Sequence, residues 1–132
     1  MTKRNKNYIK PKQPLCSIIV PTMNREEYLP VCINSFLSQS YINWEAIVVN
    51  DAGRDVSHIV NSFHDKRLKY ISNSSNIGLG ATRNEGLKIA QGEYISYCDD
   101  DDGIYPWFLQ TMLKEIQSCN SPLIYGDVVR KI

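Results

Sequence analysis

Four short apolar runs, each separated from the next by a segment long enough to form a helix, limit the folds open to this chain. The runs are rich in β-branched and aromatic residues, as buried strands are. They lie at residues 15–20, 44–49, 68–71 and 94–98. Strands that alternate with helices predict an α/β domain with a mostly parallel sheet and helices on both faces.

The segments around these runs predict four helices. In the first of them, apolar side chains recur at intervals of three and four from Tyr28 to Leu37, which gives one stripe that faces the core. Asn24 is suited to cap this helix. The helices are expected at residues 25–39, 56–63, 81–90 and 107–116, and a further strand at residues 123–129.

Length and charge indicate one folded unit behind a basic leader. A chain of 132 residues with 42% hydrophobic content buries one core, so residues 15–132 are interpreted as one domain. Residues 1–12 contain five Lys and Arg and no acid, and residues 1–14 are expected to be a flexible leader. The leader has a single aromatic residue, Tyr8, among its five basic residues, and no nucleic-acid partner is expected.

No apolar stretch approaches the roughly 18 residues of a membrane-spanning helix, and the amino terminus lacks the apolar segment of a secretory signal. A cytoplasmic location is therefore expected, with peripheral attachment at the inner membrane face as one form of it. The four cysteines lie far apart without a C-x-x-C pair, which predicts reduced core residues and no zinc site or disulfide framework.

An acidic run, Asp99 to Asp102, follows the fourth strand directly. Four adjacent carboxylates repel one another unless a cation lies among them, and their hard oxygen atoms suit Mg²⁺ or Mn²⁺ better than Zn²⁺. Gly103 and Pro106 end the strand, which puts the run at the strand's carboxyl end, where open α/β sheets bind ligands. The alternative is a solvated acidic turn.

Three more loops at strand ends carry polar residues, at positions 21–24, 50–53 and 76–83. In a parallel sheet all four loops open on one edge. Taken singly, Thr22 and Asn24 could cap a helix, Asp51 could form a turn and Arg83 could be a solvated helix residue. Together with the acidic run, the set of donors and acceptors indicates a site for a nucleotide pyrophosphate and a divalent ion.

Two common nucleotide-binding motifs do not fit. The segment Gly78-Leu-Gly80-Ala-Thr-Arg83 begins like a dinucleotide-binding G-x-G-x-x-G motif, but it follows the third strand and ends in arginine. A G-x-x-x-x-G-K-[ST] phosphate loop is absent from the sequence.

Four segments in order carry a resemblance to a known family: SIIVPTMN at 17–24, WEAIVVNDAG at 44–53, NIGLGATRNEG at 76–86 and GEYISYCDDDD at 92–102. They closely resemble the inverting family 2 glycosyltransferases, which have the Rossmann-like GT-A fold. The resemblance covers about residues 16–129. It implies Mg²⁺- or Mn²⁺-dependent transfer of a sugar from a UDP- or dTDP-sugar to a hydroxyl acceptor, glycan or lipid-linked, in polysaccharide or glycoconjugate synthesis.

The resemblance also implies roles for single residues. Thr22 matches a position that holds the nucleobase, Asp51 one that accepts a hydrogen bond from a uracil-type imide, and Arg83 one near the base and phosphates. Asp99 and Asp101 resemble the ends of a D-x-D motif, with both as metal ligands and Asp100 near the ribose. The implied nucleotide-sugar-binding set is Pro21, Thr22, Asn24, Asp51, Asn76, Gly80, Arg83, Asp99 and Asp100.

The sequence departs from the family pattern at three positions: Met23 replaces a common aromatic residue, and Asn50 and Ala52 replace the usual Asp and Gly. The resemblance implies a general base in the second half of the fold, beyond Ile132. Asp127, the only late carboxylate, would lie on the final strand, which suits a structural role or a sugar contact. The alternative function is therefore a truncated or degenerate module that binds nucleotide and metal without transferring sugar. Its incomplete sheet edge would favour self-association.

Overall fold

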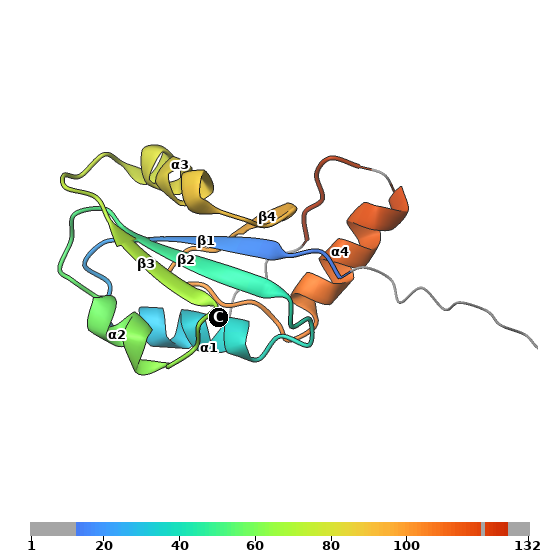
Figure 1. Ribbon diagram of the computed structural model, residues 1–132, viewed down its shortest axis with the longest axis horizontal. Helices are drawn as coiled ribbons and strands as arrows, with labels where there is room; N and C mark the ends of the chain where they lie inside the picture. The colour runs from blue at the N-terminus through green and yellow to red at the C-terminus, as the bar shows by residue number, and fades with distance from the viewer. Residues whose placement is uncertain (1–12, 120, 127–132) are drawn as a thin grey trace, which may run out of the picture.

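A four-stranded parallel sheet forms the centre of the computed structural model, which describes residues 13–119 and 121–126. The strand order is β3-β2-β1-β4, and every pair is parallel (Figure 1). The elements are β1 (Cys16–Thr22), α1 (Leu29–Leu37), β2 (Trp44–Asn50), α2 (Ser57–Ser62), β3 (Leu68–Ser72), α3 (Leu79–Ile89), β4 (Tyr94–Tyr97) and α4 (Phe108–Cys119). The predicted alternation of four strands with four helices is confirmed.

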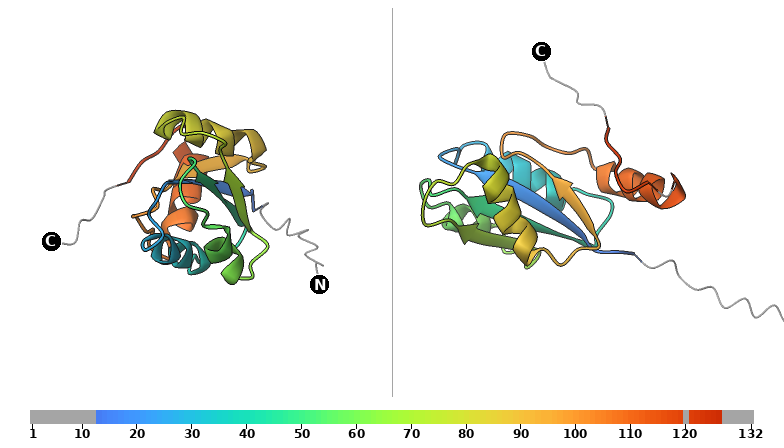
Figure 2. Two further views of the ribbon diagram at one scale, coloured as in Figure 1. Left: turned by 90° about the vertical axis from the view of Figure 1, so that its left-hand side faces the viewer. Right: turned by 90° about the horizontal axis from the view of Figure 1, so that it is seen from above.

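Helices cover both faces of the sheet, as expected. Every residue of β1 and β2 is buried, and successive side chains point to opposite faces. Ile18 and Val48 belong to the core formed with α1, α2 and the start of α4. Figures 1 and 2 show α3 on the opposite face from α1 and α2.

Gly86 allows α3 to lie close against the sheet. A Cβ atom at this position would be 2.7 Å from Ile19 Cγ2 and 3.1 Å from Val49 Cγ2, which is closer than packed carbon atoms approach. Because Gly86 is within one turn of Arg83, this close packing also determines where Arg83 stands over the sheet.

Strand β1 runs two residues further than predicted, through Pro21 and Thr22. The pairing of β1 with β4 ends at Ile19, whose carbonyl accepts the last bond from Cys98 N. The backbone of Pro21 faces the β4 side of β1, as that of Ile19 does, but β4 has already ended at this level. The absence of an N–H group on Pro21 therefore costs no hydrogen bond between the two strands. Thr22 and Asn50 consequently end their strands side by side.

The first helix begins later than predicted, at Leu29 instead of residue 25. Residues 26–28 form a turn, and Asn24 has a positive φ of 54°. The Asn24 Oδ1 atom accepts a hydrogen bond from Arg54 N at 2.8 Å, so Asn24 does not cap α1. The expectation that Asn24 is a helix cap is wrong, because its side chain instead joins two loops at the sheet edge.

The end of the chain also differs from the prediction. Residues 123–126 form no strand, and the remainder of the expected strand, with Asp127, lies outside the described residues, as do residues 1–12 of the expected leader. Cys16, Cys32 and Cys98 are buried free thiols, as expected of core residues, whereas Cys119 is exposed, so its expected place in the core is wrong. No helix in the described part of the chain combines the length and apolar character needed to cross a membrane.

Candidate functional site

A cleft of about 530 Å³ opens where the strands end at their carboxyl side. All four polar loops contribute to it, which confirms that they meet on one edge of the sheet. The lining residues are Pro21, Thr22, Met23, Arg25, Asp51, Asn76, Gly78, Leu79, Thr82, Asp99, Asp100 and Asp101.

Asp100 forms the floor of the acidic part of this cleft and is only 4% exposed. Its Oδ2 atom accepts a 2.7 Å hydrogen bond from Thr22 Oγ1, and its Oδ1 atom lies 3.4 Å from Arg25 Nη1. Burial raises the pKa of Asp100 above its usual value, and the Thr22 hydrogen bond and the Arg25 charge only partly oppose this rise. Asp100 is therefore held in place by protein groups.

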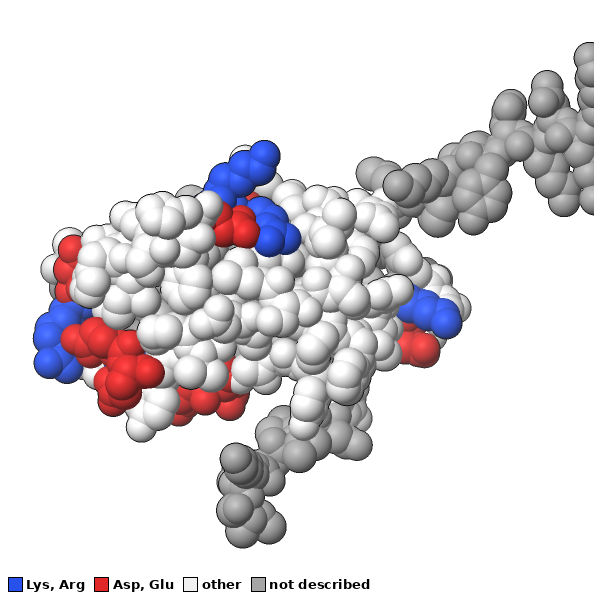
Figure 3. Space-filling view, turned by 90° about the horizontal axis from the view of Figure 1, so that it is seen from below, with Lys and Arg blue, Asp and Glu red and all other residues white. Residues whose placement is uncertain are grey.

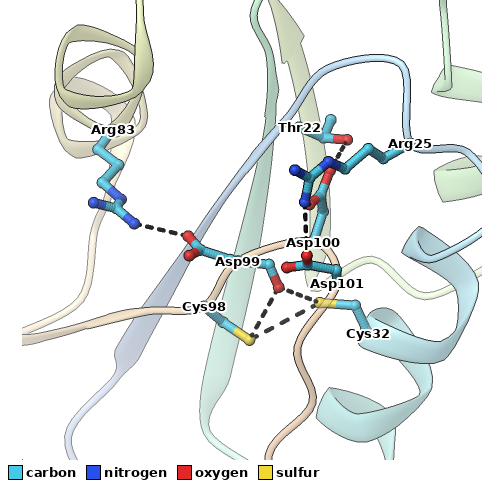
Figure 4. Close-up of polar contacts among 8 residues, drawn as sticks. All are labelled: Thr22, Arg25, Cys32, Arg83, Cys98, Asp99, Asp100 and Asp101. Carbon is cyan, nitrogen blue, oxygen red and sulfur yellow. Dashed lines mark hydrogen bonds and ion pairs between the residues drawn. The ribbon is translucent and has the colours of Figure 1, made fainter.

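Two arginines approach the acidic run from opposite sides (Figure 4). Arg83 Nη2, from α3, donates to Asp99 Oδ1 at 2.7 Å, and Arg25 Nη1 donates to Asp101 Oδ2 at 2.7 Å. The Asp99 and Asp101 side chains are each 45% exposed. In this structure the guanidinium groups supply the positive charge that the sequence analysis had assigned to a metal ion.

The donor set nevertheless fits a hard divalent cation. No group of three or more His, Cys, Asp or Glu residues in the described ranges, 13–119 and 121–126, is arranged to hold a metal by itself. Asp99 and Asp101 present carboxylate oxygens to the cleft, and Mg²⁺ and Mn²⁺ are commonly bound by one or two carboxylates with water and substrate phosphates. Asp101 and Asp99 would therefore hold such an ion.

Asp51 fastens the loop that precedes α3. Its Oδ1 atom accepts hydrogen bonds from Ile77 N at 2.8 Å and Asn73 Nδ2 at 3.0 Å, and its Oδ2 atom accepts one from Gly78 N at 2.9 Å. Burial alone would raise the pKa of Asp51, but these hydrogen bonds and one from Thr82 outweigh it and lower the pKa. The expected contact of Asp51 with a nucleobase stays a prediction, because its carboxylate already has protein donors.

The replacement of aspartate by Asn50 has a structural reason. Asn50 Nδ2 lies within hydrogen-bond distance of Gly53 O, Arg54 O and Tyr70 Oη, and Asn50 Oδ1 accepts from Gly53 N. A carboxylate could not donate to the two carbonyl groups. Asn50 therefore closes the turn after β2, in which Ala52 takes up a positive φ of 60°.

Two buried thiols lie beneath the acidic run. Cys32 Sγ, on α1, is 3.9 Å from Cys98 Sγ, and both sulfur atoms lie within 3.6 Å of the Asp99 carbonyl oxygen (Figure 4). The hydrogen bond with Cys98, followed by burial, raises the pKa of the Cys32 thiol. The two thiols thus contact the main-chain carbonyl of Asp99 from below.

The structure gathers most of the predicted site residues but not all. Pro21, Thr22, Asp51, Asn76 and the three aspartates 99–101 line the cleft. Three predicted residues do not: Asn24 binds Arg54, Gly80 lies in the exposed first turn of α3, and Arg83 meets the cleft through Asp99.

Five further residues line the cleft and were not predicted as site residues: Met23, Arg25, Gly78, Leu79 and Thr82. A signal for Arg25 was present in the sequence. It is the basic residue next to the polar loop 21–24, which was already expected to face the carboxylates 99–102.

Comparison with known proteins gives consistent matches. Residues 17–131 match the family model described as Glycosyl transferase family 2. The Escherichia coli K12 glycosyl transferase WcaA, whose name refers to colanic acid biosynthesis, is 41% identical over 79% of this chain and 38% of its own length. The E. coli enzyme WfgD, named as a UDP-Glc:α-D-GlcNAc-diphosphoundecaprenol β-1,3-glucosyltransferase, is 34% identical over 86% of this chain and 45% of its own length.

Among solved structures, Staphylococcus aureus TarS residues 1–349 in complex with UDP-GlcNAc superimposes with a TM-score of 0.77 and 31% identity. The match covers 88% of this chain and 37% of TarS 1–349. The chain therefore spans less than half the length of each of these three proteins, and the superposition confirms the fold indicated by the sequence.

Proposed function

We propose that this chain, which belongs to the family 2 glycosyltransferases and has their GT-A fold, is the donor-binding part of an inverting, metal-dependent enzyme. The donor would be a UDP- or dTDP-sugar and the acceptor a hydroxyl group. One observation carries the proposal: the cleft brings Asp51 and the acidic run 99–101 to one sheet edge, with Arg25 beside the carboxylates.

The contents of the cleft suit a nucleoside diphosphate with a divalent ion. Asp101 and Asp99 would hold Mg²⁺ or Mn²⁺, and the ion would neutralise charge on the departing nucleoside diphosphate. Thr22, at the end of β1, would support the base, and Asp100, in the loop after β4, would support the ribose. The UDP-GlcNAc complex of TarS and the UDP-glucose donor in the name of WfgD support a uridine nucleotide.

The proton-transfer step is assigned outside this cleft. An inverting displacement needs a base that deprotonates the acceptor hydroxyl opposite the leaving group. The four carboxylates that line the cleft, Asp51, Asp99, Asp100 and Asp101, all accept hydrogen bonds from protein donors and lie on the donor side. We therefore assign the general base to a segment outside the described residues.

For the acceptor, we propose a glycan or lipid-linked hydroxyl in polysaccharide or glycoconjugate synthesis, at the cytoplasmic face of a membrane. The lipid-linked acceptor in the name of WfgD supports this proposal. Nucleic acid is not proposed as a partner. On the face formed by α1 and α2, Lys and Arg lie beside acidic residues and do not gather into a basic patch (Figure 3).

Calorimetric titration of UDP, with Mn²⁺ or with EDTA, tests the donor site. We expect binding with Mn²⁺ and a loss of at least roughly tenfold in affinity without it, which corresponds to about 1.4 kcal/mol of lost metal–phosphate interaction. Asp101→Asn should remove most of the metal dependence. Asp102→Asn is the matched control, because Asp102 is exposed and does not line the cleft.

A nucleotide series tests the role of Asp51. UDP and dTDP should bind more tightly than ADP and CDP, since the imide N–H of uracil and thymine gives Asp51 an additional donor that the ring nitrogens of adenine and cytosine do not supply. In the titration with and without metal, equal UDP affinity in EDTA and in Mn²⁺ would contradict the metal site. In the nucleotide series, equal affinity for ADP and UDP would contradict only the contact of Asp51 with the base.

A further inference from the structure

Arg25 is the cleft residue whose position the proposed function does not yet explain. Its Nη1 atom lies 2.7 Å from Asp101 Oδ2 and 3.4 Å from Asp100 Oδ1. The Arg25 side chain is 50% exposed and belongs to the loop between β1 and α1, so it has room to move away from the carboxylates. The positive charge thus lies on the carboxylates that a divalent cation would use.

A divalent cation and Arg25 compete for the same oxygen atoms. A metal ion bound to Asp101 Oδ2 would place two like charges within a few ångströms of each other, which is unfavourable in a partly desolvated cleft. Arg25 therefore has to leave Asp101 before or while a metal ion binds there. In the open cleft, the strongest new partner for the released guanidinium is a phosphate group, which it can bind in a bidentate manner.

We propose that Arg25 is a positioning residue that occupies the cation's place on Asp101 in the nucleotide-free cleft and moves to the diphosphate when metal and nucleotide bind. This inference rests on the proposed function. The exchange couples the two ligands: metal alone must displace Arg25 without offering it a partner, whereas metal with diphosphate supplies one. Each ligand therefore increases the affinity of the other by the same factor.

Arg83 is less suited to this exchange. It pairs with Asp99 from the rigid helix α3, and its guanidinium lies 5.7 Å from the centre of the Tyr97 ring. Its side chain is less exposed than that of Arg25, and Arg83 does not line the cleft. These contacts hold Arg83 at the side of the site, whereas Arg25 lies within it.

The test compares the 132-residue chain with its Arg25→Met variant in two titrations, first with MnCl₂ alone and then with UDP at saturating MnCl₂. Without Arg25, Mn²⁺ alone should bind about 2- to 5-fold more tightly, the change expected from loss of one exposed ion pair. UDP should bind roughly 10- to 100-fold more weakly, as expected when a charge-assisted hydrogen bond to phosphate is lost.

Two further variants sharpen the result. Arg25→Lys keeps a positive charge near Asp101, so its affinity for Mn²⁺ alone should stay low while its UDP affinity falls less than in Arg25→Met. Arg54→Met is the matched control: Arg54 pairs with Glu26 at 2.6 Å, is exposed and does not line the cleft. It should leave both affinities at the wild-type values.

The outcomes separate this inference from the proposed function. If the wild-type chain binds UDP with Mn²⁺ but Arg25→Met leaves the affinity for Mn²⁺ alone unchanged, the place-holding role is overturned and the donor site stands. Unchanged UDP affinity in Arg25→Met would overturn the move to the diphosphate. If the wild-type chain does not bind UDP with Mn²⁺, the proposed function itself fails.

Discussion

Thr22 and Asp100, 78 positions apart in the sequence, are joined by a 2.7 Å hydrogen bond between two buried side chains. Thr22 ends β1, and Asp100 lies in the loop that follows β4. The bond therefore ties the first and last loops of the cleft together. It also places the central carboxylate of the acidic run in a fixed position between its two more exposed neighbours.

Replacing Thr22 by valine should lower the free energy of unfolding by about 1–3 kcal/mol, because a hydrogen bond to a buried charged group is lost. Thr22→Ser keeps the hydroxyl and should lose much less. The pKa of Asp100 is already raised by burial, and loss of the Thr22 bond would raise it further. The native state would then bind protons more readily than the unfolded chain.

The sign of the pH effect follows from this shift. A raised folded pKa means that stability falls as the pH rises from the ordinary value of 3.8 through the folded value. The deficit of Thr22→Val should therefore be larger at neutral pH than below pH 3.8 in urea unfolding curves. A deficit that is independent of pH would contradict the assigned hydrogen bond.

Asp51→Asn should lower the stability chiefly at neutral pH. The folded pKa of Asp51 is lowered, since hydrogen bonds from Ile77 N, Asn73 and Gly78 N outweigh its burial. Its stabilisation is present above 3.8 and is lost as the pH falls through the folded pKa. We expect a loss of about 1–3 kcal/mol at neutral pH that shrinks in acid. Urea unfolding of Asp51→Asn and the wild-type chain, at neutral pH and below pH 3.8, measures this loss. A loss of the same size at the two pH values would count against this role of Asp51.

Glu45 provides a comparison at the opposite end of the sheet. Its carboxylate accepts hydrogen bonds from Ser17 Oγ at 2.6 Å, Lys69 Nζ at 2.6 Å and Gln91 N at 2.7 Å. Burial would raise the pKa of Glu45, but these partners outweigh it and lower the pKa. Glu45→Gln should lower the stability by about 1–3 kcal/mol without changing UDP affinity. A matching loss of UDP affinity would show that the two ends of the sheet are coupled.

The two glycines of α3 should respond oppositely to alanine. Gly86→Ala places a methyl group 2.7 Å from Ile19 Cγ2, and overpacking of this kind destabilises a fold by about 1–3 kcal/mol. The higher helix propensity of alanine stabilises it by only about 1 kcal/mol, so the net effect should be destabilising. Gly80→Ala meets no atom within 4 Å and should stabilise the chain by up to about 1 kcal/mol. Thermal unfolding of both variants measures the difference. Equal melting temperatures would mean that α3 is not seated against β1 as described.

Nucleotide binding and sugar transfer should separate in the 132-residue chain. The donor-side loops are present. If the general base lies beyond Ile132, as the resemblance implies, transfer by this chain should be lower by about 10²- to 10⁴-fold. β4 is an edge strand of the described sheet, and its Ile95 and Tyr97 side chains are exposed, which favours self-association. Light scattering and a transfer assay on one sample would test both expectations. Multiple-turnover transfer by a monodisperse monomer would contradict them.

Local patterns in the sequence were enough to predict the four strands of the described sheet, the helices between them and the acidic run, but the further strand expected at residues 123–129 is wrong over residues 123–126. A buried parallel strand is a short apolar run, and residues 44–49 or 94–98 show this without reference to the rest of the chain. The shared edge of the four polar loops follows from one rule about parallel sheets, so the sequence also located most of the cleft.

Only the tertiary structure decided how the cleft residues pair. Because the strand order is β3-β2-β1-β4, β1 and β4 are neighbours, and Thr22 and Arg25 meet Asp100 and Asp101. The close packing of Gly86 against Ile19 likewise brings Arg83 to Asp99. Apolar periodicity is a local property that a sequence displays, whereas an ion pair between residues 76 positions apart depends on which strand ends become adjacent. For that reason the sequence by itself located the acidic run, and the fold alone determined which two arginines pair with it.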